Sequence, residues 1–347
     1  MLEASFQKHL LNFKRPSGTS RGVMNSKETY FLILKTEESF GVGECGLLRG
    51  LSIDDRSDYE EELEGVCENI ALGVSEENLY EALQEFPSLQ FGVETAFKSL
   101  NSKNPFELFP SEFTRGEESI PINGLVWMGD KAFMNEQISE KLKQGFTCIK
   151  MKIGAIDFKT ELELLKSIRK EFSSQEVELR VDANGAFSPK EALEKLKVLS
   201  DLKLHSIEQP IKQGQWQEMA RLCEETPLPI ALDEELIGIF FEEEKSKLLN
   251  TVKPQFIILK PSLIGGFRGS DTWINIAEKH NAGWWITSAL ESNVGLNAIS
   301  QYTFTKNSKL PQGLGTGSLY SNNIDSPLEV SNGTLHYNPS AHWKFQF

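Results

Sequence analysis

Cysteine and histidine are scarce in this chain, and it contains no long apolar run. Its four cysteines form no C-x-x-C pair, and so few thiols among 347 residues make a poor disulfide framework. The five histidines do not cluster, which argues against a zinc site. No segment approaches the roughly 20 apolar residues of a membrane span, and the first residues lack the apolar run of a signal peptide. We therefore expect a cytoplasmic protein with reduced thiols.

Basic residues are also in deficit. Lys and Arg together number 36 against 50 Asp and Glu, which gives a formal net charge of −14. A surface of this sign repels polyanions, so we expect neither nucleic acid nor a membrane as a partner. A small carboxylate substrate is still compatible with this charge, because a bound cation or paired lysines dominate the potential of their own pocket. The composition leaves the oligomeric state open.

Residues 1–118 combine strand and helix patterns. The stretch TYFLILKTEESFGVGEC, residues 29–45, has two apolar runs around a polar turn and predicts a β-hairpin. Three acidic stretches, at 58–70, 75–86 and 91–101, carry apolar residues at helical spacing and predict helices. We interpret this part of the chain as an α+β domain.

From residue 119 onward, short β-rich runs alternate with amphipathic stretches, which predicts parallel strands joined by right-handed crossovers. Eight runs in about 200 residues favour a closed βα barrel over 119–321, with an open doubly wound sheet as the alternative. The tail, 322–347, contains a strand pair around Asn-Gly, which we expect to return to the N-terminal domain. The runs are 119–127, 146–154, 177–185, 204–210, 228–236, 254–262, 283–292 and 313–320.

Five successive barrel strands end in a charged residue, at intervals of 25 to 30 positions. In a βα barrel these ends meet at one mouth, where active sites are built. Three acids that converge there need a cation, and oxygen donors suit Mg²⁺, with Mn²⁺ as a possible substitute. We therefore predict Asp182, Glu208 and Asp233 as metal ligands, with Lys152 on the strand before them and Lys260 on the strand after.

Each of these residues alone would ordinarily be a helix cap or a surface charge, and only their succession indicates a site. Two lysines beside a metal suit removal of a proton next to a carboxylate, because the metal stabilises the enediolate that forms. A lysine accepts that proton only when neutral, and burial beside positive charges lowers the pKa of a lysine. We expect the adjacent Glu234 and Glu235 to face elsewhere.

The set as a whole resembles the catalytic pattern of the enolase superfamily, in its muconate-lactonizing subgroup. The resemblance covers nearly the whole chain and implies a (β/α)7β TIM-like barrel with an α+β capping domain, formed by residues 1–118 and the tail. It also implies that Lys152 and Lys260 are the catalytic residues. The matching residues are Lys150, Lys152, Asp182, Glu208, Asp233 and Lys260.

Within this subgroup, GVGECGLLRGLS (41–52) and RVDANGAF (180–187) most resemble the o-succinylbenzoate synthases of menaquinone biosynthesis. That resemblance implies a lyase that dehydrates 2-succinyl-6-hydroxy-2,4-cyclohexadiene-1-carboxylate. N-succinylamino acid racemases and muconate cycloisomerases share the catalytic set and stay as alternatives, as does an inactive metal-binding barrel. Dipeptide epimerases usually carry Asp-x-Asp in the last barrel strand, which GLGTGSLY (313–320) lacks.

Three further residues are candidates for substrate contact in this resemblance. Lys150 and Asn184 lie at the same strand ends as the catalytic set. Arg21 lies in GTSRGVMN, residues 18–25, a capping-domain loop that we expect to close over the substrate. Its guanidinium would meet the succinyl carboxylate of the substrate.

The last two barrel runs supply the remaining candidates. Ser288 and Glu291 lie at the end of the run 283–292 and are expected to line the pocket. The motif GLGTG lacks the spacing of a dinucleotide fingerprint and comes too late in the chain to open a βαβ unit. It predicts instead a tight loop, containing Gly315 and Thr316, whose N–H groups hold a substrate carboxylate.

Overall fold

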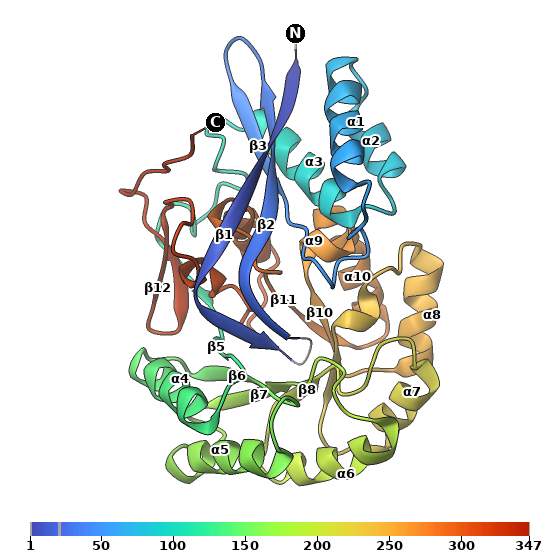
Figure 1. The fold of residues 1–347 in the computed structure, drawn as a ribbon, viewed down its shortest axis with the longest axis vertical. Helices are drawn as coiled ribbons and strands as arrows, with labels where there is room; N and C mark the ends of the chain where they lie inside the picture. The colour runs from blue at the N-terminus through green and yellow to red at the C-terminus, as the bar shows by residue number, and fades with distance from the viewer. Residues whose placement is uncertain (1, 20–21, 347) are drawn as a thin grey trace.

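The structure, a computed structural model, describes residues 2–19 and 22–346 (Figure 1). In the upper part of Figure 1, an antiparallel sheet packs against helices from the first third of the chain. In the lower part, parallel strands alternate with helices that surround them, and one long hairpin runs down to them from the upper sheet. Within the described residues, no helix has the length and apolar character needed to span a membrane.

The N-terminal sheet has three antiparallel strands, in the order β1 (Glu3–Thr19), β2 (Gly22–Lys35) and β3 (Phe40–Cys45). The hairpin predicted at 29–45 is confirmed, since β2 pairs with β3 along this stretch. Strand β1 was not predicted, because polar residues interrupt its apolar ones. It pairs with β2 over most of its length, and the β1–β2 hairpin carries the chain to the barrel, where Gly18 bridges Met128.

Helices α1 (Tyr59–Ala71), α2 (Glu76–Ala82) and α3 (Pro87–Leu100) confirm the three predicted helices. Their apolar faces share one core with alternate residues of β2. Helix α3 lies very close to β3, because Gly43 has no side chain. A Cβ atom at that position would lie 2.0 Å from the carbonyl oxygen of Gly92 and 2.5 Å from Oγ1 of Thr95.

The barrel is built on a seven-stranded parallel sheet in which neighbours along the chain are neighbours in space. Its strands are β5 (Gly124–Val126), β6 (Cys148–Lys152), β7 (Glu178–Asp182), β8 (Ser206–Glu208), β9 (Ile230–Leu232), β10 (Phe256–Leu259) and β11 (Gly283–Ile286). The helices that follow them are α4 (Lys131–Lys143), α5 (Phe158–Glu171), α6 (Pro189–Ser200), α7 (Trp216–Glu225), α8 (Glu242–Val252), α9 (Pro261–Ile264), α10 (Gly266–Lys279) and α11 (Asn293–Thr305).

A short segment closes the barrel. Gln312 makes a parallel bridge to Ile122, and Gly313 makes one to Thr287. The predicted closed barrel is thereby confirmed. The strand expected at 313–320 was wrong beyond its first residue, because the glycine-rich chain turns away and forms the 3₁₀ helix η2 (Thr316–Leu319).

The first predicted run, 119–127, divides into two strands. Its start, β4 (Ile120–Pro121), leaves the barrel and pairs antiparallel with the tail, whereas β5 stays in the barrel. The proline explains the break, since it has no N–H group to donate to a parallel neighbour.

The tail forms the predicted hairpin, with β12 (Leu328–Ser331) and β13 (Thr334–Tyr337). Its Asn-Gly turn has the left-handed backbone that this pair favours. Beyond the hairpin, the ring of Trp343 stacks on Phe106 with centroids 4.3 Å apart, and Phe345 packs edge-on against Phe31 of the N-terminal sheet. The tail therefore contacts both parts of the molecule. The domain bounds 1–118, 119–321 and 322–347 stay a prediction.

Replacing Gly43 by alanine should lower the free energy of unfolding by about 3 kcal/mol, because the added methyl group meets the backbone of α3. Gly65, inside α1, faces open space where a methyl group would lie, so Gly65→Ala should raise stability by about 0.5 to 1 kcal/mol. Urea unfolding followed by circular dichroism measures both. Equal effects of the two substitutions would contradict the close packing of α3 on β3.

Candidate active site

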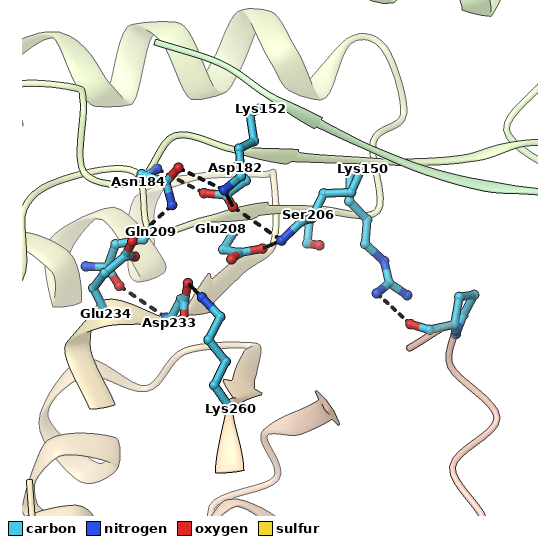
Figure 2. A network of polar contacts seen from close by, with 12 residues as sticks. Lys150, Lys152, Asp182, Asn184, Ser206, Glu208, Gln209, Asp233, Glu234 and Lys260 are labelled. Carbon is cyan, nitrogen blue, oxygen red and sulfur yellow. Dashed lines mark hydrogen bonds and ion pairs between the residues drawn. The ribbon is translucent and has the colours of Figure 1, made fainter. Parts of the chain in front are cut away.

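Five charged side chains meet at the carboxyl ends of the barrel strands (Figure 2). The strand register places Lys152, Asp182 and Glu208 in one row across β6, β7 and β8. Asp233 follows β9 directly, and Lys260 follows β10 directly. In Figure 2, the two lysines reach the acids from opposite sides. The sequence thus placed this set correctly in space, and all three carboxylates are almost completely buried.

Ammonium groups hold the acids together. The Nζ atom of Lys152 lies 2.7 Å from Oδ2 of Asp182. A second lysine of β6, Lys150, bridges two acids, with its Nζ atom 3.3 Å from Oδ2 of Asp182 and 2.8 Å from Oε2 of Glu208. Lys260 forms a short ion pair with the third acid, Asp233. Lys150 therefore has a defined place within the cluster, between two of its acids.

Burial and ion pairing act in opposite directions on these groups. Burial alone would lower the pKa of Lys150, but the charges of Glu208 and Asp182 outweigh it and hold that pKa above its usual value. The pKa of Lys260 is raised in the same way, chiefly by Asp233. Burial would raise the pKa of Asp182, but the lysines beside it hold that pKa well below its usual range. The ion pairs consequently keep these groups charged.

Glu208 is the exception among the three acids. Burial, reinforced by the charge of Asp182, raises the pKa of Glu208 well above its usual value. Its Oε1 atom is buried and makes no hydrogen bond. An oxygen acceptor of this kind, between two further carboxylates, fits a hard divalent cation.

The present side-chain positions are those of the ion-paired cluster. As they stand, the described residues contain no group of three or more His, Cys, Asp or Glu side chains that could hold a metal ion. The lysines contact the oxygen atoms that a cation would need, so metal binding requires these side chains to move. The metal site made by Asp182, Glu208 and Asp233 stays a prediction.

Asn184 extends the cluster beyond β7. Its backbone has a φ of 44°, and its N–H donates to Oδ1 of Asp182 over 3.0 Å. The side-chain Oδ1 accepts from Nζ of Lys152 over 3.0 Å, while Nδ2 donates to Oε1 of Glu234 over 2.9 Å. Asn184 thus orients Lys152. The expectation that Glu234 faces elsewhere was wrong, because the chain turns into the 3₁₀ helix η1 (Glu234–Leu236) directly after Asp233.

Gln209 is a residue of this site that sequence reasoning missed. Its side-chain Oε1 accepts from the N–H groups of Asp233 and Glu235, over 3.2 and 3.3 Å. Its Nε2 donates to Oε2 of Glu235 over 3.0 Å. The amide therefore fixes the turn that presents Asp233. The carboxylate of Glu235 accepts from Gln209 and from the N–H of Gly214, outside the cluster of lysines and acids, which agrees with the expectation that Glu235 faces elsewhere. The signal was available, since Gln209 directly follows a predicted ligand.

A cavity of about 730 Å³ opens above the cluster. Lys150, Lys152 and Lys260 line one part of its wall, whereas the three acids and Asn184 lie beneath the lysines and do not line it. Pro16, Ser17 and Met24 line it from the β1–β2 hairpin, so the capping part contributes to the pocket. The predicted contact residue Arg21 lies outside the described residues.

The other candidates lie on the wall formed after β11 and at η2. Ser288, Gly315 and Thr316 line the cavity, but Glu291 does not. The hydroxyl of Thr316 contacts that of Ser288 over 2.9 Å, and the hydroxyl of Ser288 donates to Oε2 of Glu291 over 2.5 Å. Both serine and threonine protons thus have partners within the wall.

Comparison with known proteins agrees with this geometry. Residues 134–340 match the model of the Enolase C-terminal domain-like family. An o-succinylbenzoate synthase from Desulfotalea psychrophila is 48% identical over 96% of this chain and 98% of its own. The crystal structure of MenC from the same organism aligns with a TM-score of 0.86 and 44% identity, over 96% of this chain and 99% of that one. An N-succinylamino acid racemase from Thermus thermophilus is 30% identical over 57% of this chain and 52% of its own.

The fold and the strand-end cluster define an enzyme of the enolase superfamily with a TIM-like barrel, and the chain belongs to the Enolase C-terminal domain-like family. Membership implies binding of a divalent metal ion and of a small-molecule substrate. Within the family, the similarity to o-succinylbenzoate synthase extends over nearly the entire chain, whereas the similarity to the racemase covers little more than half.

Replacing Lys150 by methionine should lower the free energy of unfolding by about 3 to 5 kcal/mol in metal-free buffer, because it leaves Glu208 and Asp182 without their shared cation. Lys197 forms an exposed pair with Glu194, so Lys197→Met should change stability by no more than about 0.5 kcal/mol. Urea unfolding with a chelator present compares the two. A Lys150→Met protein as stable as the control would mean that the buried ion pairs contribute nothing.

Proposed function

We propose that this protein is an o-succinylbenzoate synthase, a lyase that dehydrates 2-succinyl-6-hydroxy-2,4-cyclohexadiene-1-carboxylate in menaquinone biosynthesis. The observation that carries the proposal is the similarity along nearly the full length to such an enzyme, combined with lysines on both sides of three acids at one barrel mouth. The anionic substrate is compatible with the net charge of −14, because the pocket wall itself carries lysines.

Asp182, Glu208 and Asp233 are the proposed ligands of the cation, which we expect to be Mg²⁺ or, as a substitute, Mn²⁺. The unpartnered Oε1 of Glu208 and the oxygen-only donor set support this assignment. When bound, the cation supplies a positive charge that holds the substrate carboxylate and stabilises the enediolate. The acids would exchange their lysine contacts for it.

Lys152 is the proposed base and acid. Its amine takes the proton from the carbon next to the carboxylate, so that the C–H bond breaks and an enediolate forms. The lysine then returns a proton to the departing hydroxyl on the same face, the C–O bond breaks, and water leaves as the ring becomes aromatic. Asn184 holds the Nζ atom of Lys152 in place during both transfers. The reaction needs no oxidant or reductant.

Lys260 is proposed to remain an ammonium ion and to stabilise the enediolate from the opposite face. Its raised pKa supports this role, since the group stays charged over the physiological pH range. Lys150 neutralises the acids beneath the pocket. Ser288, Gly315 and Thr316 are proposed to form the wall against which the substrate lies, and Arg21 to meet its succinyl carboxylate.

N-succinylamino acid racemase is the second candidate. It uses the same proton abstraction and shares the whole catalytic set, so the cluster by itself does not choose between the two reactions. Muconate cycloisomerase and an inactive metal-binding barrel are further alternatives. The extent of the similarity favours the synthase.

Purified protein with Mg²⁺ should convert the cyclohexadiene substrate with a kcat/KM far above that for N-succinyl amino acids. Lys152→Ala should lose at least about a thousandfold in kcat, because the proton-transfer group is gone, while circular dichroism stays unchanged. Lys197→Ala, on the exposed face of α6, serves as the control. A higher kcat/KM for N-succinyl amino acids would reject the synthase assignment.

Chelation should abolish turnover, and added Mg²⁺ should restore it. Because a ligand that binds only the folded state stabilises it, Mg²⁺ should also raise the melting temperature of the protein. Asp233→Asn should remove most of that rise, while Asp201→Asn, at the exposed end of α6, should leave it intact. Full activity in EDTA, or an undiminished Mg²⁺ effect on Asp233→Asn, would refute the metal assignment.

A further inference from the structure

A second set of buried charges lies where the N-terminal sheet meets the barrel mouth. Lys27 on β2, Glu44 on β3 and Glu291 after β11 are all almost completely buried. The Nζ atom of Lys27 makes no hydrogen bond, yet Lys27 interacts electrostatically with both acids. Burial of a lysine ammonium lowers the stability of the folded state unless nearby negative charge compensates it. The two acids are the compensating charges that the structure places around Lys27.

Glu44 attaches the N-terminal sheet to a barrel helix. One carboxylate oxygen accepts from the N–H of Ser292 over 2.8 Å, and the other accepts from the N–H of Gly295 over 2.8 Å. Thr29 and Ser292 donate their hydroxyls to the same carboxylate. Glu44 therefore caps the N-terminus of α11, where these donors and the helix dipole favour an anion.

Glu291 instead connects helix α9, beside Lys260, to the loop after β11. Its Oε1 accepts from the hydroxyl of Ser262, two residues after that lysine, and its Oε2 accepts from Ser288 over 2.5 Å. Ser288 lines the cavity. The carboxylate thus ties helix α9, which directly follows Lys260, to the loop after β11 without itself reaching the pocket.

The capping part packs directly against the side chains of Ser262 and Glu291. A Cβ atom on Gly46, directly after β3, would lie 3.0 Å from Cβ of Ser262 and 3.1 Å from Cγ of Glu291. The GVGECG part of the motif at 41–52 therefore has a physical role at this contact: Glu44 caps α11, and Gly46 permits close approach to Glu291.

We propose that Glu291 is a positioning residue of the reaction, and that Lys27 from the capping sheet is the buried cation that keeps it ionised. An ionised Glu291 accepts hydrogen bonds from both serine hydroxyls and fixes the two segments that carry them, helix α9 beside Lys260 and the loop after β11 at the pocket wall. A protonated Glu291 would have to donate to one of these serines, which would reverse that hydroxyl and alter the pocket wall. The inference rests on the proposed function, since it assigns a role in that reaction.

Burial leaves the pKa of Glu291 above its usual value and the pKa of Lys27 below its usual value, and the charge of each group counteracts the shift of the other. The charge of Glu44 raises the pKa of Glu291 further. Tyr320, beyond η2, faces the same two acids and donates its hydroxyl to the carbonyl of Leu290. Lys27 is consequently the cation within this group that offsets the cost of an ionised Glu291.

The first test follows the pH dependence of kcat/KM. Glu291→Gln should lower kcat/KM by about tenfold to a hundredfold, since one serine hydroxyl must reverse to accept from the amide. Lys27→Met should move the acidic limb of the profile to higher pH by at least about one unit, because Glu291 then holds its proton more tightly. Lys27→Met combined with Glu291→Gln should show no such shift. If Glu291 only stabilises the fold, all variants should be less stable while the acidic limb of the kcat/KM profile stays at the same pH. That result would overturn the proposal.

The second test measures stability and does not depend on the reaction. In urea unfolding at pH 8, Lys27→Met should shift the unfolding midpoint to lower urea, and this shift should shrink in a Glu291→Gln background, because one uncompensated carboxylate is gone. Equal shifts in both backgrounds would overturn the pairing of Lys27 with Glu291. If the cyclohexadiene substrate is not turned over, the proposed function fails, and the profiles are recorded with N-succinyl amino acids instead.

Discussion

Compensation of buried charge is the constraint on which the centre of this molecule depends. Asp182, Glu208 and Asp233 lie almost completely out of water, where an uncompensated carboxylate costs several kcal/mol. The compensating positive charge comes from Lys150 and Lys152 of β6 and from Lys260, directly after β10. Strand register makes this possible, since it holds the partners in one row across neighbouring strands. A divalent cation is a natural replacement for ammonium groups in such a cluster, because both are positive and both contact oxygen.

The sequence was enough to predict the closed barrel and the positions of the charged residues at its mouth. These features follow from a repeat of strand plus helix, whose length sets the spacing from Lys152 to Lys260. Parallel strands in one sheet place their ends together, so a linear pattern determines a spatial cluster. The helices of the N-terminal part were predictable for a similar reason, because each carries its own apolar periodicity.

Other features depend on contacts that no local pattern encodes. Strand β1 forms by pairing with β2, because its own sequence lacks a regular alternation of apolar and polar residues. The barrel closes through Gln312 and Gly313 instead of a full strand, since Gly313 has no side chain to meet Thr287. Gln209 and Glu234 reach the site only because the chain turns sharply after β8 and β9. The hydroxyl of Ser288 donates to Glu291, a contact that depends on the folded position of that acid. These are properties of the folded chain, so spacing alone did not reveal them.

The packing of Trp343 and Phe345 against the N-terminal part has a consequence for synthesis of the protein. Phe31 of β2 is translated long before Phe345, whose ring covers it, and Phe106 is translated long before Trp343, which stacks on it. Until then, one face of the sheet is exposed to water while the whole barrel is made. An aromatic surface exposed in a partly synthesised chain favours aggregation, so this face stays vulnerable until the tail has packed on it.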